Sequence, residues 1–328
     1  MDRAWIEPKA VSGAEEGSFF QKSPMLSIVT TAYNEVGNVE PFLTRTLTAL
    51  RQLPVESEII YIDDGSTDGT SEAVEKFIQS NPNVTVALIR HPSRLGITAA
   101  VEESVAVAKG KWLCLLPADL ESLPNVDIPI LYRAVDDETD MVMGIRQGRK
   151  DGKFLSSRLY NLLNGWLFGV KLSDANWIKL IRRETMVGIR LRSNWHRYMV
   201  PILAHYGCRI KEVETPWYPR LYGSSKFGLK RFPGSLADML TIKFLLTYGK
   251  RPFLFFGWVS AMTGIVSLVF LFSLLLTNAA ETKKWVTVLV LFAVSLTVGL
   301  VSLGIGLVAE ICNGTDLKDR AGNVHGQL

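Results

Sequence analysis

Two acidic residues separated by one position, Asp119 and Glu121, follow an apolar run in the stretch LCLLPADLES. Carboxylate oxygens are hard ligands of the kind that magnesium and manganese prefer, and these ions keep water or phosphate oxygens in their other positions. The first apolar run of the chain is not followed by GxGxxG, and no phosphate-cradling GxxxxGK[ST] loop occurs. If phosphates bind to this chain, a divalent cation held by carboxylates is the candidate for neutralising them.

Polar residues also follow the earlier apolar runs of the chain. Tyr33 and Glu35 come after LSIVTTA, Asp63 and Asp64 stand at the end of EIIYID, and Arg94 comes after VTVALIR. Ser66 and Asp68, in the DDGSTDG turn, suit helix capping as well as ligand binding. A functional role is the better interpretation of the two acids that stand directly at the end of a run.

The elements that would position these residues alternate in type. Strands are expected at 26–32, 58–63, 84–90, 111–116 and 141–144, and the segments between the early ones carry apolar residues at helical spacing. Strands separated by single helices indicate an α/β fold with a doubly wound, mostly parallel sheet. Ligands of such sheets bind beyond the carboxyl ends of the strands, where the polar residues stand.

Two long segments near the end of the chain, 252–277 and 285–309, contain no charged residue. Each is long enough to cross a hydrocarbon core of about 30 Å as a helix. The alternative, two buried helices of a soluble bundle, requires protein to surround both. Lys243, Lys250 and Arg251 precede the first segment, so the positive-inside rule predicts a two-span membrane protein whose N-terminal domain faces the cytosol.

The chain therefore divides into five expected parts. They are a loose arm at 1–24, a cytosolic catalytic domain at 25–228, a segment at 229–250, two transmembrane helices within 251–311 and a cytosolic tail at 312–328. The segment at 229–250 mixes basic and apolar residues, which fits an amphipathic interfacial helix or an ordinary helix packed on the domain. Gly304 and Gly306 would let helices approach closely in a homo-oligomer. The three cysteines and four histidines have no metal-ligand spacing, which argues against a zinc site.

The motifs SIVTTAYNE, YIDDGSTDGT, ADLES and YGSSKFG, followed by a membrane hairpin, resemble the inverting family-2 glycosyltransferases with the GT-A fold. Within that family the resemblance is to the polyprenyl-phosphate branch, which includes dolichyl-phosphate mannose synthase. It extends over about 26–308 and implies a nucleotide-sugar donor, a divalent metal and a membrane-embedded acceptor, undecaprenyl or dolichyl phosphate. Nucleic acid is not among the implied partners.

Carried over by position, the resemblance assigns residues to the donor and the metal. The donor-binding residues are Thr31, Tyr33, Glu35, Asp63, Asp64, Arg94 and Ala118. Asp119 matches the second acid of the family's DxD metal motif, and Glu121 falls on a nearby position that completes the metal's shell. Pro117 replaces the first acid and removes one carboxylate and one backbone donor. Metal binding is then weaker, supported by the donor's phosphates, or lost.

The resemblance also assigns residues to the acceptor and to the transferred phosphates. They are Arg146, Arg149, Arg158, Asp174, Lys179, Arg220, Ser225 and Lys226. Asp119, Asp174 and Arg158 are the implied catalytic residues. For the arginines at 146–158, a solvated face beside anionic lipid is the alternative interpretation.

The reaction that the resemblance implies is attack of a polyprenyl phosphate oxygen on the anomeric carbon, with inversion. A phosphate monoester is already anionic near neutral pH, so a strong general base is not needed. Two alternatives stay open. One is a processive polysaccharide synthase, although the downstream QxxRW signature is missing; the other is a catalytically silent, membrane-tethered nucleotide-sugar binder or partner subunit, which Pro117 favours.

Overall fold

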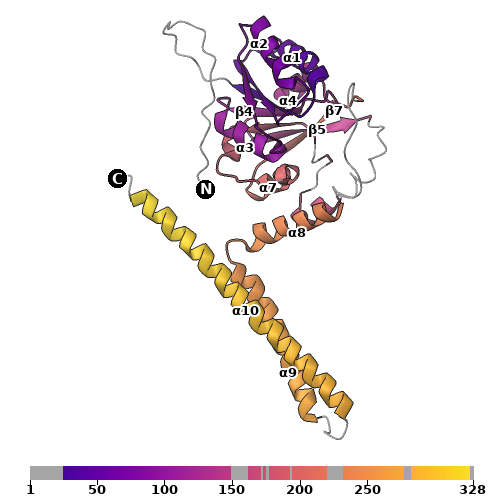
Figure 1. The fold of residues 1–328 in the computed structure, drawn as a ribbon, viewed down its shortest axis with the longest axis vertical. Helices are drawn as coiled ribbons and strands as arrows, with labels where there is room; N and C mark the ends of the chain where they lie inside the picture. Colours follow the sequence, from indigo (N-terminus) through magenta and orange to yellow (C-terminus); the bar gives the residue numbers. More distant parts are fainter. Residues whose placement is uncertain are drawn as a thin grey trace. The chain divides into compact units, whose positions relative to one another are not determined.

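The computed structural model describes residues 25–148, 162–170, 173–174, 177–192, 194–219, 232–276 and 282–325. The chain separates into two compact units, 1–239 and 240–328. In the first unit strands and helices alternate (Figure 1). The elements are β1 (Leu26–Ala32), α1 (Val36–Leu50), β2 (Ser57–Asp63), α2 (Thr70–Ser80), β3 (Val86–Arg90), α3 (Ile97–Val107), β4 (Trp112–Pro117), α4 (Pro124–Arg133), β5 (Met141–Gln147), β6 (Lys179–Arg182), α6 (Arg183–Met186), η1 (Trp195–Tyr198), α7 (Met199–His205) and β7 (Ile210–Pro216).

The described strands form one sheet in the order β3-β2-β1-β4-β6-β5-β7. All neighbours pair in parallel except β6, which is antiparallel to both β4 and β5. The mostly parallel, doubly wound α/β sheet predicted from the sequence is confirmed, and each of the five expected strands is present. The two strands that were not expected, β6 and β7, complete the sheet on the side beyond β4.

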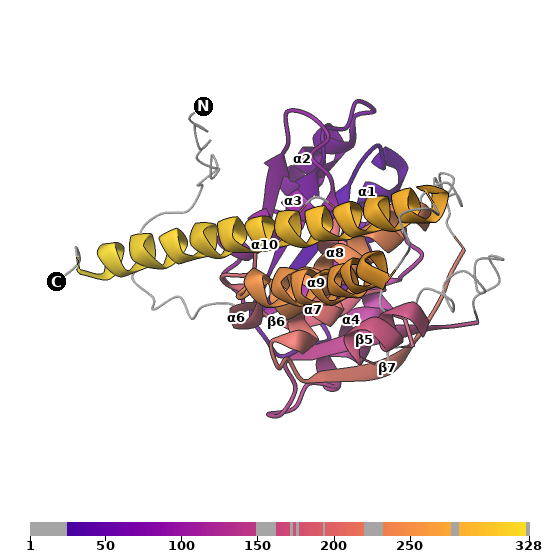
Figure 2. The same ribbon diagram turned by 90° about the horizontal axis from the view of Figure 1, so that it is seen from below.

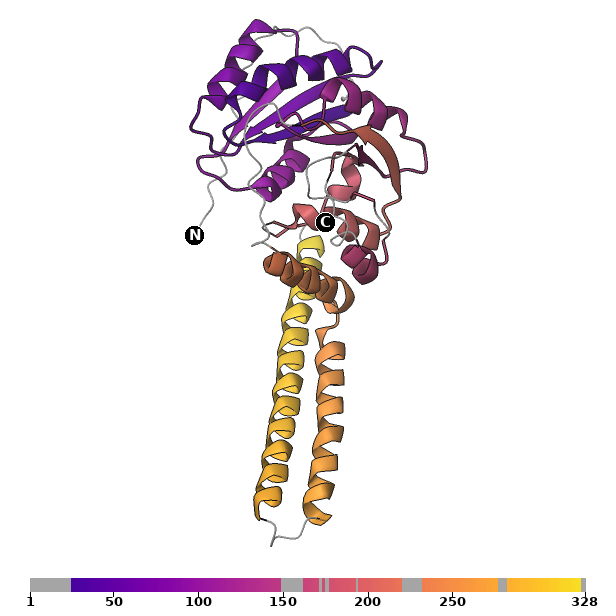
Figure 3. The same ribbon diagram turned by 90° about the vertical axis from the view of Figure 1, so that its right-hand side faces the viewer.

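Helices cover both faces of the sheet (Figure 3). Because successive side chains of a strand point to opposite faces, β2 serves two core clusters at once. Ile59 and Tyr61 pack with Phe42 of α1 and the buried residues of α4, whereas Ile60 and Ile62 pack with Ala100 of α3. Strands that are apolar on both faces are typical of parallel sheets covered by helices, and they hold the strand ends that carry the polar residues.

The second unit contains a helical hairpin, α9 (Pro252–Leu276) and α10 (Thr282–His325), which lie side by side (Figures 1 and 2). Both helices are long and apolar enough to cross a membrane, over Pro252–Leu276 and Lys283–Asn313, and only 6% of each apolar window is buried. Such exposure does not fit the buried helices of a soluble bundle. Residues 312–325, expected as a tail, continue α10.

Close contacts join the two helices of the hairpin. A Cβ on Gly306 would lie 2.8 Å from Cβ of Phe256, so this glycine lets α10 approach α9, whereas a Cβ on Gly304 would meet no atom within 4 Å. Ser267 and Ser295 share a hydrogen bond with an Oγ–Oγ distance of 2.8 Å. At one end of the hairpin, Glu310 Oε2 accepts a hydrogen bond from Phe253 N at 3.1 Å. Gly306 therefore serves the close packing of α9 and α10 within the hairpin.

A further helix, α8 (Phe232–Tyr248), crosses the boundary between the units. Its apolar residues lie all around the helix, with Met239 and Ile242 buried and Leu236 and Leu240 exposed. The described part of 229–250 therefore lacks the separate apolar face expected of an amphipathic helix. Its location at a membrane interface stays a prediction.

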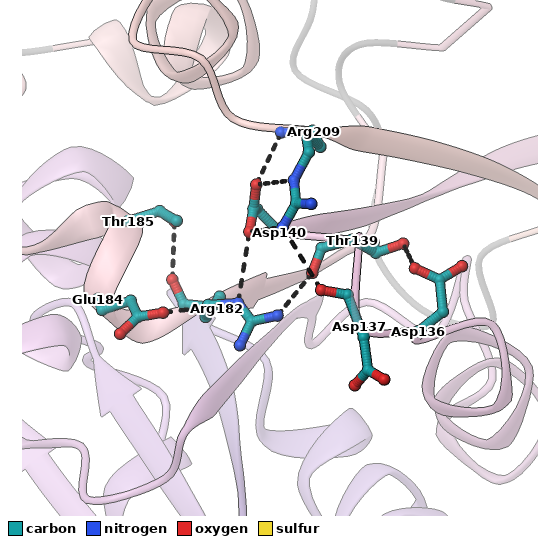
Figure 4. Close-up of polar contacts among 8 residues, drawn as sticks. All are labelled: Asp136, Asp137, Thr139, Asp140, Arg182, Glu184, Thr185 and Arg209. Atoms are coloured by element: carbon teal, nitrogen blue, oxygen red, sulfur yellow. Dashed lines mark hydrogen bonds and ion pairs between the residues drawn. The ribbon is translucent and has the colours of Figure 1, made fainter.

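Polar side chains tie the amino ends of β5 and β7 and the far end of β6 together (Figure 4). Arg209 donates from Nε to Oδ2 of Asp140 at 3.0 Å and from Nη2 to Oδ1 at 3.2 Å. Arg182 lies 3.5 Å from the same carboxylate, donates to the carbonyl of Thr139 at 2.9 Å and stacks over the ring of Trp112. Since this network occupies the amino edge of the sheet, we interpret it as structural.

Candidate active site

The opposite edge of the sheet brings the predicted site residues together. Thr31 pairs with Pro117 at the ends of β1 and β4, and Ala32 pairs with Asp63 at the end of β2. Because β6 is antiparallel, its first residue, Lys179, lies at the same edge, opposite Leu115. Residues far apart in the sequence thus converge on the carboxyl ends of three parallel strands, the usual ligand site of such sheets.

The turns after β1 and β2 are joined by hydrogen bonds. Asn34 N donates to Oγ of Ser66 at 2.9 Å, and Val36 N donates to Oδ2 of Asp68 at 3.1 Å. Asp68 Oδ1 also accepts from the backbone N–H of Thr70 at 3.0 Å. Asp68 therefore caps the first turns of both α1 and α2, where orphan N–H groups need acceptors. For Asp68 the structure supports capping, whereas Ser66 accepts from the N–H of Asn34, which lies before α1.

Asp63 is 3% exposed and accepts hydrogen bonds from Ser66 N at 2.9 Å and from the hydroxyl of Ser71. It borders a hollow of about 170 Å³ beside the ends of β2 and β3. The lining residues are Asp63, Gly65, Ser66, Ser71, Glu72, Arg90 and His91. The hollow is polar and lies at the predicted donor edge, which agrees with a donor contact for Asp63.

Asp64 uses its carboxylate differently from the role that the resemblance implies. Its Oδ1 accepts from Leu95 N at 2.7 Å and Gly96 N at 3.0 Å, and lies 2.8 Å from Nδ1 of His91. The carboxylate thus holds the turn that follows β3. A direct contact between Asp64 and the donor stays a prediction, and His91 is a site residue that the sequence analysis did not find.

Two residues that are predicted to bind the nucleotide-sugar donor, and that follow different strands, lie against each other. The guanidinium carbon of Arg94 is 4.4 Å from the centre of the Tyr33 ring, a cation–π arrangement. Glu35, in the same turn as Tyr33, accepts a hydrogen bond from Nδ2 of Asn38 at 2.6 Å. Tyr33 and Arg94 therefore form one face beside the ends of β1 and β3.

The acidic loop directly follows β4. Ala118 and Asp119 are 2% and 9% exposed, and Asp119 Oδ1 accepts from the backbone N–H of Glu121 at 3.2 Å. Leu120 between the two acids is fully buried and has a φ of 57°, which turns the chain sharply. Within the described residues no group of three His, Cys, Asp or Glu side chains could hold a metal ion. The loop itself offers two carboxylates in one turn, a donor set suited to magnesium or manganese whose other ligands are phosphate oxygens or water.

Arg146, at the end of β5, and Asp174 form a two-pronged ion pair. Nε of Arg146 lies 2.5 Å from Oδ2 of Asp174, and Nη2 lies 2.6 Å from Oδ1. The guanidinium also stacks over Trp177, whose Nε1 donates to the Thr215 hydroxyl at 3.0 Å. Residues that were predicted from separate motifs thus contact one another through an ion pair and a stacking interaction.

A buried lysine lies near this ion pair, and a half-buried histidine lies near the lysine. Lys179 is 6% exposed and donates from Nζ to the carbonyl of Trp177 at 2.6 Å. Burial lowers the pKa of Lys179 to about 8, with Asp174 acting in the opposite direction. Burial together with Arg197 and Lys179 lowers the pKa of His196 to about 3, so that imidazole is neutral. His196, missed in the sequence, contacts Thr98 at 3.0 Å.

Five of the predicted residues lie outside the described part of the chain: Arg149, Arg158, Arg220, Ser225 and Lys226.

The carboxyl edge of the sheet thus carries Asp63 and Asp119 at the ends of β2 and β4, and Lys179 with the Arg146–Asp174 pair beside them. The chain belongs to glycosyl transferase family 2, whose model matches residues 27–196. It is therefore a glycosyltransferase, as the resemblance of its motifs implied.

Two curated proteins are similar over nearly the whole chain. Dodecaprenyl-phosphate galacturonate synthase of Rhizobium johnstonii is 30% identical over 308 residues, which cover 90% of each chain. Undecaprenyl-phosphate 4-deoxy-4-formamido-L-arabinose transferase of Edwardsiella ictaluri is 30% identical over 299 residues, which cover 89% of this chain and 90% of the other.

A solved structure supports the fold alone. Glucosyl-3-phosphoglycerate synthase of Mycobacterium tuberculosis, in complex with Mn²⁺, UDP-glucose and phosphoglyceric acid, is 15% identical. It superposes with a TM-score of 0.51 and covers 68% of this chain and 79% of its own. The similarity confirms the GT-A fold predicted from the sequence.

Proposed function

We propose that the protein is a membrane-bound glycosyltransferase that moves a sugar from a nucleotide sugar to a polyprenyl phosphate, with inversion. The observation that carries the proposal is the register between β4 and β6, which sets Lys179 opposite Leu115, two residues before the strand end that bears the acidic loop. A basic acceptor side and an acidic donor side thus share one edge. Similarity to two polyprenyl-phosphate sugar transferases over about nine-tenths of the chain supports the acceptor class.

The donor is proposed to bind along the ends of β1, β2 and β4. Tyr33 and Arg94 would face the base or ribose, Asp63 borders the polar hollow, and Thr31 and Ala118 line the strand ends. Asp119 and Glu121 would hold a divalent metal. When bound, such a metal neutralises charge that develops on the leaving diphosphate. Since Pro117 supplies neither a carboxylate nor an N–H, the donor's phosphates would complete the metal's shell.

The acceptor phosphate is proposed to bind between Arg146 and Lys179. A phosphate monoester carries between one and two negative charges at neutral pH, so its oxygen is a competent nucleophile without a strong base. A buried cation such as Lys179 gains much from an anionic partner, because the surroundings screen the charges weakly. Asp174 would keep Arg146 in a fixed orientation through the two-pronged pair.

The transfer then proceeds in one displacement. A phosphate oxygen of the lipid bonds to the anomeric carbon while the bond from that carbon to the donor's diphosphate oxygen breaks, and the nucleoside diphosphate leaves with the electron pair. One displacement inverts the anomeric configuration. The protein contributes by holding two anionic reactants together and stabilising the leaving charge. We further propose that the catalytic domain faces the cytosol, on the basis of the basic residues before α9.

The test is sugar transfer by the purified full-length chain in nanodiscs to undecaprenyl or dolichyl phosphate. Donors are nucleotide-activated galacturonate and 4-deoxy-4-formamido-L-arabinose, the sugars named in the relatives, together with UDP-glucose and GDP-mannose. We expect one donor to give a glycosyl phosphate lipid of inverted configuration, and chelation to abolish the product. Binding of a donor without transfer to either lipid would instead support the silent-binder alternative that Pro117 favours.

A further inference from the structure

His91 occupies a position between three elements and has no role in the transfer described above. It directly follows β3 and is 7% exposed. Its Nδ1 lies 2.8 Å from Oδ1 of Asp64, and its Nε2 lies 2.9 Å from Oε2 of Glu103 on α3. A neutral imidazole has a single N–H and would present a lone pair to one of these carboxylates. Two carboxylate partners therefore favour a doubly protonated, positively charged ring.

The same Asp64 carboxylate holds the turn after β3. It accepts from Leu95 N at 2.7 Å and from Gly96 N at 3.0 Å, and its side chain is 4% exposed. Next to it the backbone of Gly65 packs directly on that turn, since a Cβ there would lie 2.7 Å from the carbonyl carbon of Ser93. With a φ of 76°, Gly65 also adopts a conformation that favours glycine. The turn after β3 is thus fixed to the end of β2.

This fixed turn carries a predicted donor residue. Arg94 directly precedes Leu95, whose N–H is bound by Asp64, and the Arg94 guanidinium lies 4.4 Å from the centre of the Tyr33 ring. A continuous set of contacts therefore runs from Glu103 through His91 and Asp64 to Arg94. Each link is a hydrogen bond or a peptide bond, so a change at His91 would be transmitted to the face formed by Tyr33 and Arg94.

We propose that positively charged His91, held by Glu103, is a positioning residue for the nucleotide-sugar donor. It orients the carboxylate of Asp64, and through Asp64 it sets the turn that places Arg94 beside Tyr33. The proposal rests on the proposed function, since it assigns to His91 a part in binding that function's donor. It also gives Asp64 a role in shaping the site.

The charge on His91 should make donor binding depend on pH. Burial lowers the pKa of His91, but the hydrogen bonds with Asp64 and Glu103 outweigh burial and raise that pKa above its ordinary value. The other charged groups around the ring, Asp63, Glu72 and Arg90, line the adjoining hollow. As the pH rises through the pKa of His91, the ring loses its charge and one of its N–H donors. Donor affinity is then expected to fall.

The test is calorimetric titration of UDP and GDP, with magnesium, into the full-length chain in nanodiscs from about pH 6 to about pH 9, the range in which histidine titrates. In the wild type we expect affinity to fall as the pH rises. Glu103→Gln removes one carboxylate and should move this fall to lower pH. His91→Asn, which keeps one N–H near the Nδ1 position but no charge, should bind about tenfold more weakly, the loss expected from removing one hydrogen bond to a charged group. Glu75→Gln, which removes an exposed partner of Arg90, is the matched control and should behave as the wild type.

A second measurement needs no ligand and separates the two proposals. Hydrogen exchange of the segment 92–97, corrected for intrinsic rates, should be faster in His91→Asn than in the wild type, and faster in Glu103→Gln at high pH. Equal exchange in all variants, or a pH dependence of binding that Glu103→Gln leaves in place, would overturn the role of His91. Failure of the wild type to bind either nucleotide would instead count against the proposed function, because the exchange differences do not depend on it.

Discussion

Arg146 and Asp174 meet in a planar, two-pronged ion pair, with N–O distances of 2.5 and 2.6 Å. The pair joins the end of β5 to the segment before β6, and the stacking of Arg146 on Trp177 adds a third contact. Arginine suits this position because its fork matches a carboxylate and its plane matches an aromatic ring. The geometry shows an arginine whose orientation is fixed before any ligand arrives.

Arg146→Lys tests whether that orientation matters. Lysine keeps the charge but cannot form the fork, so we expect sugar transfer to fall by about a hundredfold, the loss that a misplaced binding group can cause. Arg209→Lys is the matched control, because Arg209 forms a similar fork with Asp140 at the opposite edge of the sheet (Figure 4). Rates measured with both variants should differ strongly. Equal losses would mean that the Arg146 fork serves the fold alone.

Asp119→Asn tests the acidic loop. Loss of one of two carboxylates should reduce transfer by roughly a hundredfold or more, since a metal supplies several kcal/mol of charge stabilisation. We expect the residual activity to need a higher manganese concentration, while the melting temperature changes little. Asp137→Asn, an exposed acid on the opposite edge, should leave both quantities unchanged. Unaltered manganese dependence in Asp119→Asn would remove this residue from the metal site.

The pKa of Lys179, lowered to about 8 by burial, predicts an alkaline limit of activity. Below about pH 8 the amine is charged and attracts the acceptor phosphate; above it the charge is lost, so kcat/KM for the lipid should fall. Lys179→Arg keeps the charge at high pH and should move this limit upward if the variant folds. An unchanged limit in a folded Lys179→Arg protein would assign it to another group.

The stability of the protein should change in the opposite direction over the same pH range. Between the pKa of Lys179 in the folded chain, about 8, and the ordinary lysine value of 10.5, the unfolded chain binds more protons at this site. The Lys179 contribution to the free energy of unfolding therefore rises with pH in that window. Denaturant unfolding of the wild type and Lys179→Met at several pH values measures this contribution. If the free energy of unfolding depended on pH in the same way in both proteins, the lowered pKa of Lys179 would be contradicted.

Gly306→Leu tests the packing of the hairpin. A Cβ at Gly306 would lie 2.8 Å from Cβ of Phe256, so a leucine must separate α9 from α10 or distort them, at a cost of about 1–3 kcal/mol. Gly304→Leu is the matched control, since a Cβ there meets no atom within 4 Å. Thermal unfolding in nanodiscs should show a loss for Gly306→Leu alone. A change of oligomeric state in Gly304→Leu would place Gly304 in a contact between copies.

The sequence predicted the five strands that are rich in apolar and β-branched residues, of which β3 is partly exposed and the others are largely buried. Leu26–Ala32 was expected with both of its bounds, because four consecutive β-branched residues, 28–31, form its centre. The strands β6 and β7 were not predicted. β6 has only four residues, and β7, with the sequence IKEVETP, is half-exposed at the edge of the sheet and carries three charged residues, Lys211, Glu212 and Glu214. Neither contains the apolar run by which the other strands were found.

The residues of the candidate site were likewise predicted only in part. Residues that directly follow a strand were found because strand ends in parallel sheets converge. His91 also follows a strand, but the sequence analysis considered histidines only as metal ligands. Its partner Glu103 lies on a helix and is recognisable only in three dimensions. His196 comes near Lys179 through the packing of η1 and α3, which no local pattern encodes.

The bond between Phe253 and Glu310 also bears on how the hairpin is made. The two residues lie 57 positions apart, so during synthesis the start of α9 leaves the ribosome long before the residue that caps it. The backbone N–H of Phe253, in the first turn of α9, therefore acquires this acceptor only once Glu310 of α10 has been translated. A chain truncated before Glu310 would lack this hydrogen bond, so the first turn of α9 depends on a residue of α10 for one of its acceptors.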